Sequence, residues 1–445
     1  MRPFTHTMPF PEALSLALQA TIPISRTEHV ALGAADGRVV SHDVVSPLDV
    51  PPFDRSAMDG YAVQSADLRS ASAAAPVALT CVARIFTGEV SIGELRSGEC
   101  IQIATGAPMP NGADAVVMVE ETSTAGAGVP EPAGGLAEAA RVFFSVAAKA
   151  GQNIGRRAAD IAVGTSVVTR GQVLTPSRIG ALAATGHRTV EVFAKPTVAI
   201  VSTGNEVVQP GLPLPPGHIY DINRFTLESV ARRHGGAPLA LASPGDSLDE
   251  LMRVLDAAMA HDLIVFSGGS SVGDRDLVRD VIAERGEMLF HGIAVKPGKP
   301  TAFAVMTSGV VSPSNGQREL PRDTVETPVA SSEAKRLPRS LFIGMPGNPT
   351  SCLSNAYILM VPVLRKLAGL PPWEPHTVTV PLARRIISAS DRHQFYTVRL
   401  VNGQAEPAFK GSGDITSMAN ADGYMEIPAT TESIGAGTLV TVTLF

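Results

Sequence analysis

The chain has 445 residues, of which 44% are hydrophobic and 18% are charged, and this balance excludes a wholly disordered protein. The formal net charge of -6 and the 5% of aromatic residues argue against a nucleic-acid-binding surface, which needs a basic face or stacking rings. The three cysteines show no CxxC spacing and no apolar run approaches the roughly 20 residues of a membrane span, so we expect a soluble, cytoplasmic protein without a disulfide framework or zinc knuckle.

Two short helices of similar character are predicted in the first half of the chain. Near the N-terminus, Leu14, Ala17 and Leu18 have the spacing of one helical face. The second helix has Thr175 as a suitable N-cap, and Gly186 lies just beyond its end. We interpret both helices as parts of one elongated domain.

Between these helices, residues 49–147 follow a different pattern. Short runs rich in Val and Ile are separated by Gly, Pro and Asn, which is typical of a mainly β domain. We therefore predict that this β-rich domain is inserted into an elongated, discontinuous domain made of residues 1–48 and 148–194. The segment 124–140, rich in Gly, Ala and Pro, is predicted to be a mobile surface loop.

Residues 195–373 have the pattern of an α/β domain. Continuous apolar runs each lead into a Gly-rich or polar loop, and helices such as 225–234 alternate with them. This alternation predicts a doubly wound fold, in which helices cover both faces of a parallel sheet. The segment 308–339 has no periodicity and is predicted to be a disordered insertion. The apolar runs are 198–201, 263–266 and 341–343.

The last part of the chain, residues 374–445, is β-rich again. It follows a proline-rich boundary and contains runs of β-branched and aromatic residues. We predict a small C-terminal β-barrel domain. The predicted strands are 377–380, 394–400 and 438–442.

The loop at 267–273 is the first candidate binding site. In an open α/β sheet, ligands bind beyond the carboxyl ends of the strands, and this loop follows such a strand. Its three glycines and three serines can turn backbone N–H groups and hydroxyls toward a phosphate. It is neither a Walker loop nor a GxGxxG fingerprint, and the alternative is an ordinary strand-to-helix turn.

A second candidate is the Pro-Gly turn that carries Lys296 and Lys299. The chain has 7 lysines against 29 arginines, yet two of the lysines lie on this one turn. Lysine is a compact point charge that suits phosphate or another oxyanion. The alternative is that both are solvated surface side chains.

Carboxylates form the third candidate group. Glu206, Asp246 and Asp276 all fall near predicted strand ends, and acidic residues beside an anion site are the usual way to hold Mg²⁺ against phosphates. As alternatives, Asp246 could lie in the turn before a helix, and Asp276 could favour a helix N-terminus. The sequence has no HExxH or GxSxG motif, so nothing indicates a metalloprotease or an esterase.

Taken together, seven segments of the chain resemble the molybdopterin molybdotransferase family, which includes bacterial MoeA and the C-terminal region of gephyrin. The resemblance covers nearly the whole chain and includes the order of the motifs. The insertion at 308–339 departs from the compact family pattern, and the C-terminal domain around Arg392 and Ser412 follows that pattern only loosely. The segments are PPFDRSAMDGYA at 51–62, IATGAPMPNGADAVV at 103–117, GQNIGRRAADI at 151–161, STGNEV at 202–207, SGGSSVGDRD at 267–276, VKPGKP at 295–300 and GMPGNPTS at 344–351.

The resemblance implies an elongated four-part subunit that works as a homodimer, with active sites in clefts between domains of the two subunits. It also implies a reaction in which adenylylated molybdopterin and molybdate give molybdenum cofactor and AMP, in a step that depends on Mg²⁺. Further implied partners are other cofactor-synthesis proteins and apo-molybdoenzymes.

The family's functional positions carry over to named residues of this sequence. Three of the catalytic positions, Asp59, Thr105 and Asp160, would complete the cleft from the other subunit. The other catalytic positions, which are also the expected Mg²⁺ ligands, are Glu206, Asp246 and Asp276. The resemblance also implies binding roles toward phosphate or molybdate for Lys296, Lys299, Arg392 and Ser412. The chemistry of the 267–273 loop adds four expected residues for the pterin phosphate: Ser267, Gly268, Gly269 and Ser271.

Two other functions remain as alternatives at this point. A relative built from the α/β domain alone adenylylates molybdopterin with ATP, but the additional domains of this chain favour the insertion step. A non-catalytic scaffold, as gephyrin also is, would not need the complete set of charged motifs.

Overall fold

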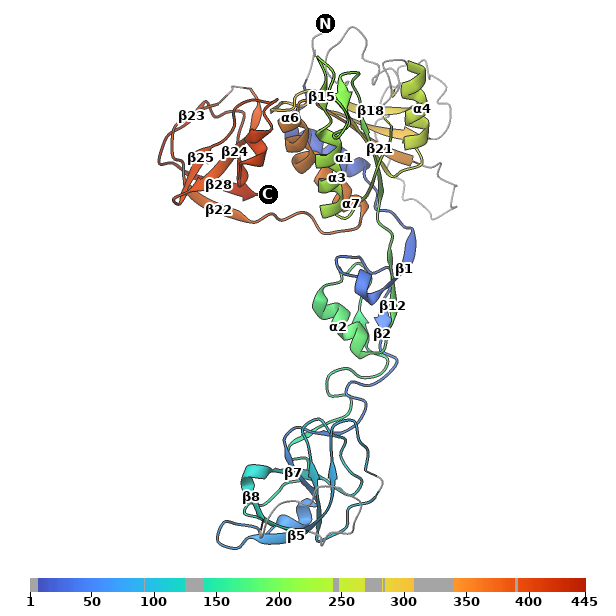
Figure 1. Ribbon diagram of the computed structural model, residues 1–445, viewed down its shortest axis with the longest axis vertical. Helices are drawn as coiled ribbons and strands as arrows, with labels where there is room; N and C mark the ends of the chain where they lie inside the picture. Colours follow the sequence, from blue (N-terminus) through green and yellow to red (C-terminus); the bar gives the residue numbers. More distant parts are fainter. Residues whose placement is uncertain are drawn as a thin grey trace, which may run out of the picture. The chain divides into compact units, whose positions relative to one another are not determined.

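The computed structural model describes residues 7–91, 93–124, 140–242, 248–268, 282, 285–307, 339–388 and 391–445. The chain divides into two compact units, each described here by itself (Figure 1). The larger unit comprises Met1–Glu28, Gly37–Val39 and Val192–Phe445, and the smaller comprises His29–Asp36 and Val40–Glu191. Among the described residues, no helix has the length and apolar character needed to cross a membrane.

A six-stranded sheet forms the centre of the larger unit. Its first four strands are parallel, whereas the last two, β20 and β18, run antiparallel to their neighbours. The expectation of a parallel sheet is therefore wrong for this edge, where both pairings are antiparallel. The strand order is β16 (Ala237–Ala240), β13 (Thr197–Ser202), β17 (Leu263–Ser267), β21 (Arg339–Met345), β20 (Ala302–Thr307) and β18 (Gly286–His291).

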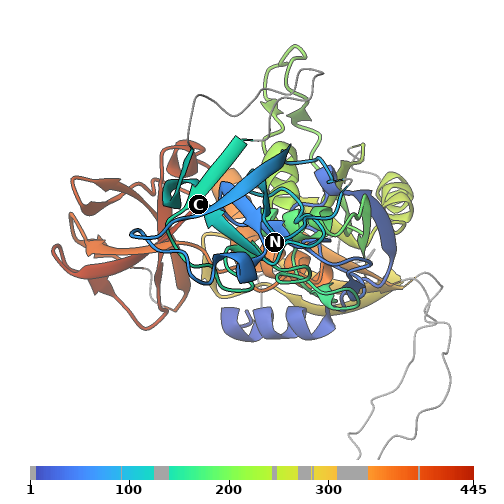
Figure 2. The ribbon, with the colours of Figure 1, turned by 90° about the horizontal axis from the view of Figure 1, so that it is seen from below.

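Both faces of this sheet are covered, which confirms the doubly wound fold. In β13, Val198 and Ile200 belong to one buried cluster, and Ala199 and Val201 belong to the other. Two buried faces explain why the strand is apolar at each of its four central positions, 198–201. Helices α1 (Phe10–Ala20), α3 (Asn223–Arg233) and α7 (Val361–Leu367) contribute to the first cluster, and α4 (Leu248–Ala258) contributes to the second (Figures 1 and 2).

The helix ends follow the local sequence signals, with one difference. Helix α3 begins at Asn223, two residues before the predicted start, and the Asp221 side chain accepts a hydrogen bond of 3.0 Å from the backbone N–H of Arg224. In the smaller unit, α2 (Pro176–Ala184) has Thr175 as N-cap, as predicted. The predicted insertion at 308–339, apart from its last residue, and a helix expected over 276–284, apart from residue 282, lie outside the described residues.

The C-terminal part of the larger unit forms a second sheet. Its order is β19 (Val295–Lys296), β24 (His393–Val401), β26 (Gly423–Ile427), β28 (Leu439–Leu444) and β22 (Thr377–Pro381), with β25 (Gln404–Pro407) also paired to β24. The edge strand β19 comes from the turn that carries Lys296, far earlier in the chain. A two-residue strand has no recognisable periodicity, so the sequence did not predict this connection.

The smaller unit contains a six-stranded sheet in the order β7 (Ala115–Met118), β4 (Gly60–Val63), β6 (Glu99–Ile103), β5 (Val77–Ile85), β9 (Ala140–Phe144) and β8 (Thr122–Thr124). Strand β4 is buried at all four positions, although it is not one of the Val- and Ile-rich runs that indicate strands in this part of the sequence. The strand was missed because it is short and begins with glycine. A side chain at Gly60 would collide with the Val117 carbonyl oxygen at 2.0 Å, so the strand can pair this closely only with glycine there.

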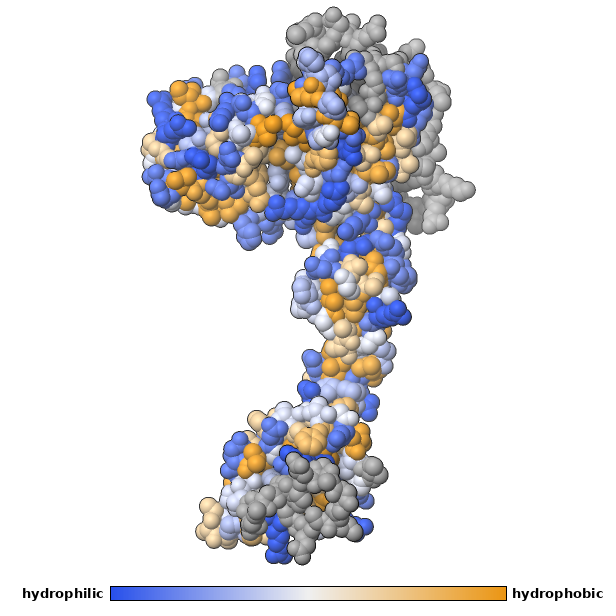
Figure 3. All heavy atoms as spheres, in the orientation of Figure 1, coloured by the Kyte–Doolittle hydropathy of each residue, from blue (hydrophilic) through white to orange (hydrophobic). Residues whose placement is uncertain are grey.

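Short two-stranded pairs connect the remaining parts of the smaller unit. Strands β2 (Val44–Val45) and β11 (Ser166–Val168) are antiparallel, as are β3 (Arg55–Ser56) and β10 (Ile154–Gly155). The visible face of each unit is a mosaic of hydrophilic and hydrophobic residues (Figure 3). Such a mixture is ordinary for a surface exposed to water.

Candidate functional site

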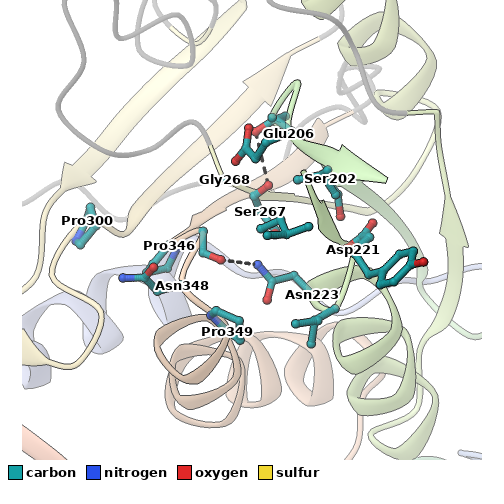
Figure 4. Close-up of a pocket in the computed structure, with 17 residues that line it drawn as sticks. Ser202, Glu206, Asp221, Asn223, Ser267, Gly268, Pro300, Pro346, Asn348 and Pro349 are labelled. Atoms are coloured by element: carbon teal, nitrogen blue, oxygen red, sulfur yellow. Dashed lines mark hydrogen bonds between the residues drawn. The ribbon is translucent and has the colours of Figure 1, made fainter. Parts of the chain in front are cut away.

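A cavity of about 500 Å³ lies beyond the carboxyl ends of the parallel strands in the larger unit. Ser202 is the last residue of β13, Ser267 is the last residue of β17, and Pro346 follows β21 directly (Figure 4). Because these strands are parallel neighbours, their ends meet at one edge of the sheet. The fold thus brings three sequence-distant loops together around one cavity.

The loop after β17 is packed tightly against its neighbour. The Ser267 carbonyl oxygen accepts a hydrogen bond of 2.9 Å from the Thr203 N–H. Gly268 has φ +93°, and a Cβ there would lie 2.5 Å from the Thr203 carbonyl oxygen, so only glycine fits. Ser267 and Gly268 both line the cavity, whereas Gly269 and Ser271 lie outside the described residues.

Two buried oxygen atoms in the cavity wall have no partner among the described residues: Ser202 Oγ and Asn223 Oδ1. The Asn223 side chain is held in place because its Nδ2 donates a hydrogen bond of 2.8 Å to the Gly347 carbonyl (Figure 4). A buried polar atom without a partner costs about 1–3 kcal/mol. The wall is therefore polar where a ligand could supply the missing hydrogen bonds.

Two carboxylates, Glu206 and Asp221, also line the cavity. The Glu206 oxygens lie 2.8 and 2.9 Å from the position that a Cβ on Gly204 would occupy, and Gly204 has φ +133°. Glycine at this position therefore allows the carboxylate to pack over the backbone. Of the three expected metal ligands only Glu206 is described, since Asp246 and Asp276 lie outside. Within the described ranges, no three His, Cys, Asp or Glu side chains gather closely enough to bind a metal ion.

The turn with Lys296 and Lys299 borders the cavity through Pro300, which is one of the lining residues. Between the lysines, Gly298 has φ +110° and accepts hydrogen bonds from Asn355 Nδ2 at 2.9 Å and Thr301 Oγ1 at 2.8 Å. Asn355 and Thr301 are fully buried. The turn is thus fixed to the interior, while neither lysine side chain lines the cavity itself.

The two expected residues of the C-terminal domain occupy different places. Asn348, which lines the cavity, donates a hydrogen bond of 3.1 Å from its side chain to Ser412 Oγ. Ser412 is therefore one hydrogen bond away from the cavity wall. Arg392 is exposed and directly precedes β24, whose first two residues pair with Val295 and Lys296. Arg392 thus lies at the start of the strand that pairs with β19, the edge strand that carries Lys296.

In the smaller unit, two of the other three expected positions are in direct contact. The Thr105 N–H donates a hydrogen bond of 2.8 Å to Asp59 Oδ1. The two segments also join through the bond of 2.8 Å from the Gly106 N–H to the Ser56 carbonyl. Asp160 is exposed, and its N–H donates to the Val50 carbonyl at 3.0 Å.

Ion pairs hold the segment around Asp160 to the segment around Asp59. Asp54 accepts a hydrogen bond of 2.7 Å from the Arg157 N–H and pairs at 2.7 Å with Arg156. These two interactions lower the pKa of Asp54 below its ordinary value, the backbone bond having the larger effect. Asp49 likewise pairs with Arg157 at 2.6 Å. The motifs at 51–62 and 151–161 are therefore joined directly by the contacts of Asp54 with Arg156 and Arg157.

The sequence singled out the segments around the cavity, but the expected site residues did not include several polar residues of its wall, among them Ser202, Asp221, Asn223 and Asn348. Ser202 and Asn348 lie inside the recognised motifs, and a strand end followed by a turn would have indicated both. Asp221 lies just before α3, and Asn223 is its first residue. The only available signal was Asp221 itself, since an Asp before a helix can accept a hydrogen bond from an N–H of the first turn, here that of Arg224. Burial without a partner distinguishes Ser202 and Asn223, and this property exists only in the folded chain.

Comparison with known proteins assigns the class to which this fold and cavity belong. The MoeA N-terminal region (domain I and II) matches residues 8–186, a probable molybdopterin binding domain matches 199–366, and the MoeA C-terminal region (domain IV) matches 379–445. The chain belongs to the MoeA family.

Individual relatives agree with this assignment. The molybdopterin molybdenumtransferase of Haemophilus influenzae is 31% identical over 430 residues, which is 95% of this chain and 94% of the relative. The enzyme of the same name from a Nostoc species is 33% identical over 420 residues, covering 92% of this chain and 87% of the relative. Two crystal structures of molybdopterin biosynthesis MoeA proteins from Pyrococcus horikoshii each match 99% of this chain, and 99% and 100% of their own, with TM-scores of 0.78 and 0.73 at 34% and 27% identity.

Proposed function

We propose that the chain is a molybdopterin molybdotransferase that inserts molybdenum into adenylylated molybdopterin and releases AMP. The family assignment supports the reaction, since relatives of similar length carry this name. The observation that carries the proposal in this chain is the cavity at the strand ends, whose wall includes Ser202 Oγ and Asn223 Oδ1 without partners. Hydroxyl and N–H groups of a pterin nucleotide are suitable partners for these two oxygens.

The residues around the cavity would have two kinds of role: neutral groups would bind a phosphate through hydrogen bonds, and cationic groups would neutralise negative charge. The backbone and hydroxyl groups at Ser267 and Gly268 would hold a phosphate of the substrate. Lys296 and Lys299, on the fixed turn, would neutralise phosphate or molybdate charge, with Ser412 as a neutral hydrogen-bonding partner and Arg392 as a further cation nearby. These roles place the anionic groups of both substrates at one side of the cavity.

The described carboxylates of the cavity wall, Glu206 and Asp221, offer oxygen ligands of the kind that Mg²⁺ prefers. Glu206 would hold the ion together with Asp246 and Asp276. When bound, Mg²⁺ would supply positive charge that stabilises the leaving phosphate oxygen of AMP. We expect Glu206→Gln to raise the Mg²⁺ concentration needed for half-maximal AMP release. The exposed Glu287, on the antiparallel edge strand, is the matched control, and Glu287→Gln should leave that concentration unchanged.

The Asp59, Thr105 and Asp160 cluster would act in the same reaction through a homodimer, with each copy completing the site of the other. Mixed dimers of an Asp59→Asn chain and a Lys296→Gln chain test this arrangement. Because one site in such a dimer would contain both native residues, we expect AMP release to recover when the two inactive variants are combined. No recovery from a verified mixed dimer would contradict the proposal.

Substitution of the unpartnered hydroxyl tests the cavity assignment directly. Ser202→Ala removes a buried atom that has no partner in the free protein, so we expect unchanged or increased stability but a raised KM for adenylylated molybdopterin. The matched control is Ser340→Ala, because Ser340 Oγ is buried in the same sheet and donates to the His261 carbonyl at 2.7 Å. This control should lose stability and keep its KM.

If ATP and free molybdopterin gave the adenylylated product instead, the chain would be an adenylyltransferase.

A further inference from the structure

Two cysteines lie side by side in the sheet of the smaller unit. Cys81 on β5 and Cys100 on β6 are direct partners in the parallel register of the two strands. Neighbouring strands are about 4.8 Å apart, and Cα atoms at about 4.4–6.8 Å suit a disulfide. Cross-strand partners also point to the same face of the sheet. The backbone therefore places the two thiols next to each other, and a disulfide between them would not require the strands to move.

The two thiols differ in exposure. Both pack in the same hydrophobic cluster with Leu79 and Val142, but Cys100 is fully buried whereas Cys81 is only partly buried. A small reagent from solvent can therefore reach the Cys81 sulfur first. Cys100 can then react only with a group that Cys81 already carries.

The electrostatics of the pair support the same order. A hydrogen bond with the Cys100 thiol lowers the pKa of Cys81 against the effect of burial, and the backbone at Gln102 and Ala83 and the charge of Arg84 contribute in the lowering direction. The same hydrogen bond and burial raise the pKa of Cys100. Since the thiolate is the reactive form of cysteine, Cys81 is the nucleophile of the pair.

We propose that Cys81 and Cys100 form a peroxide-reactive dithiol that closes to a disulfide within the chain. The Cys81 sulfur would attack one peroxide oxygen, the O–O bond would break, and the Cys81 sulfenic acid and water would form. The Cys100 sulfur would then attack the Cys81 sulfur, expelling hydroxide, which takes the Cys100 proton and leaves as water. In total, two thiols lose two electrons and one hydrogen peroxide becomes two water molecules.

This modification site is separate from the proposed transferase reaction. Strands β5 and β6 continue past the cysteines to Ile85 and Ile103, which pair with each other, and only then reach the loop with Thr105. A disulfide would thus link the two strands at the end away from the contact between Thr105 and Asp59. The proposal concerns covalent chemistry at the pair itself, whether or not the cavity in the larger unit binds a pterin.

The third cysteine provides an internal reference. Cys352 is fully buried in the larger unit, and burial raises its pKa to about 12. It also lies in the other compact unit, so no partner thiol from the pair belongs to its unit. We expect Cys352 to stay reduced under conditions that oxidise the pair.

Hydrogen peroxide treatment of the full-length protein, followed by peptide mapping without reductant, tests the proposal. We expect one cross-linked peptide pair that joins Cys81 to Cys100, and unmodified Cys352. In Cys100→Ser, Cys81 should accumulate as a sulfenic acid that a dimedone probe traps, and in Cys81→Ser neither remaining cysteine should react. Cys352→Ser should form the same cross-link as the wild type, which excludes its participation.

Three outcomes would overturn the proposal: sulfenic acid at Cys81 of the wild type that never resolves to the cross-link, a cross-link between two chains, or oxidation of Cys352 at the rate of Cys81. Circular dichroism and thermal unfolding of each variant establish that it is folded before treatment. Because every readout is a mass of a peptide, the result does not depend on transferase activity.

Discussion

The side-chain amide of Asn355 donates a hydrogen bond of 2.9 Å to the carbonyl oxygen of Gly298, from the interior of the larger unit to the turn between Lys296 and Lys299. Asn355 is the last residue of α6 (Pro349–Asn355), and the first residue of this helix, Pro349, lines the cavity. One short helix therefore contacts both the cavity wall and the turn that carries the two lysines. The position of that turn depends on Asn355 as much as on its own sequence.

Replacement of Gly298 tests this dependence. In Gly298→Ala, the new Cβ would lie 2.4 Å from Asn355 Nδ2, and the residue would have to keep φ +110°. We expect a lower urea midpoint and a raised KM for molybdate, because the turn can accommodate the methyl group only by moving. Gly403→Ala is the matched control: it also requires positive φ, at +74°, but the new Cβ meets nothing within 4 Å. The control should lose only about 1 kcal/mol of stability, and its KM for molybdate should not change. Equal stability losses in the two variants would contradict this explanation.

Asp59 accepts a hydrogen bond from the Thr105 N–H, and two variants can distinguish this structural role from a role of its charge. Asp59→Asn keeps an oxygen that can accept from the Thr105 N–H, whereas Asp59→Ala does not. If the charge acts on the substrates, both variants should lose AMP release, on the order of tenfold or more, while only Asp59→Ala is destabilised. Asp67 is a matched control, since it accepts a hydrogen bond of 2.8 Å from the Gly98 N–H in the same unit. Full activity of Asp59→Asn would show that the residue only holds the loop.

Asp262 should stabilise the larger unit in a pH-dependent manner. Its carboxylate accepts hydrogen bonds of 2.7 Å from both Arg26 nitrogens and from the Thr197 N–H. Burial alone would raise the pKa of Asp262, but these bonds and the charge of Arg26 lower it below the ordinary value of 3.8. Stability from this carboxylate is therefore present above pH 3.8 and is lost as the pH falls through its lowered pKa.

Urea unfolding of Asp262→Asn checks this expectation. We expect a loss of about 1–3 kcal/mol at pH 7, and a smaller difference from the wild type near pH 3. Asp256→Asn is the control, because its pair with Arg285 is longer, at 3.3 Å, and the Asp256 side chain is 51% exposed. That variant should change stability by less than about 1 kcal/mol. A pH-independent loss in Asp262→Asn would indicate packing rather than charge.

His234 should destabilise the larger unit in mild acid. Its ring is 4% exposed, lies 5.2 Å from the Trp373 ring, and has no hydrogen-bond partner for either nitrogen among the described residues. Burial, and then the charges of Arg365 and Arg233, lower the pKa of His234 to about 4. Below pH 6.5 only the unfolded chain takes up this proton, so stability falls by up to about 1.4 kcal/mol for each pH unit until the pH nears 4.

The variant His234→Phe removes this proton without removing a hydrogen bond. We expect its Tm to fall less than that of the wild type between pH 7.5 and pH 5, as measured by calorimetry. The control is His376→Phe, at an exposed position. Its Tm should fall over this pH range as much as the Tm of the wild type. If His234→Phe and the wild type lost equal stability over this range, another group would be responsible for the acid sensitivity.

Several parts of the fold were predictable because short-range chemistry decides them. The N-cap at Thr175 and the Gly186 stop define α2, and both are local signals. The runs at 198–201 and 263–266 became β13 and β17, because only a strand buried on both faces is apolar throughout. Strand direction at the β20 and β18 edge was not predictable, since it depends on how the connections pass over the sheet rather than on residue type.

For the candidate site, the sequence by itself determined which segments carry chemistry: the strand-end loops, the two-lysine turn and the acidic motifs that resemble the family pattern. Only the tertiary structure decided which atoms face the cavity. Ser202 and Asn223 are ordinary polar residues in the sequence, and they stand out because folding buries one oxygen of each without a partner. Likewise, Cys81 and Cys100 show no spacing rule along the chain, and pairing of β5 with β6 alone makes them neighbours. Local patterns determine elements, whereas burial and register arise only when distant segments meet.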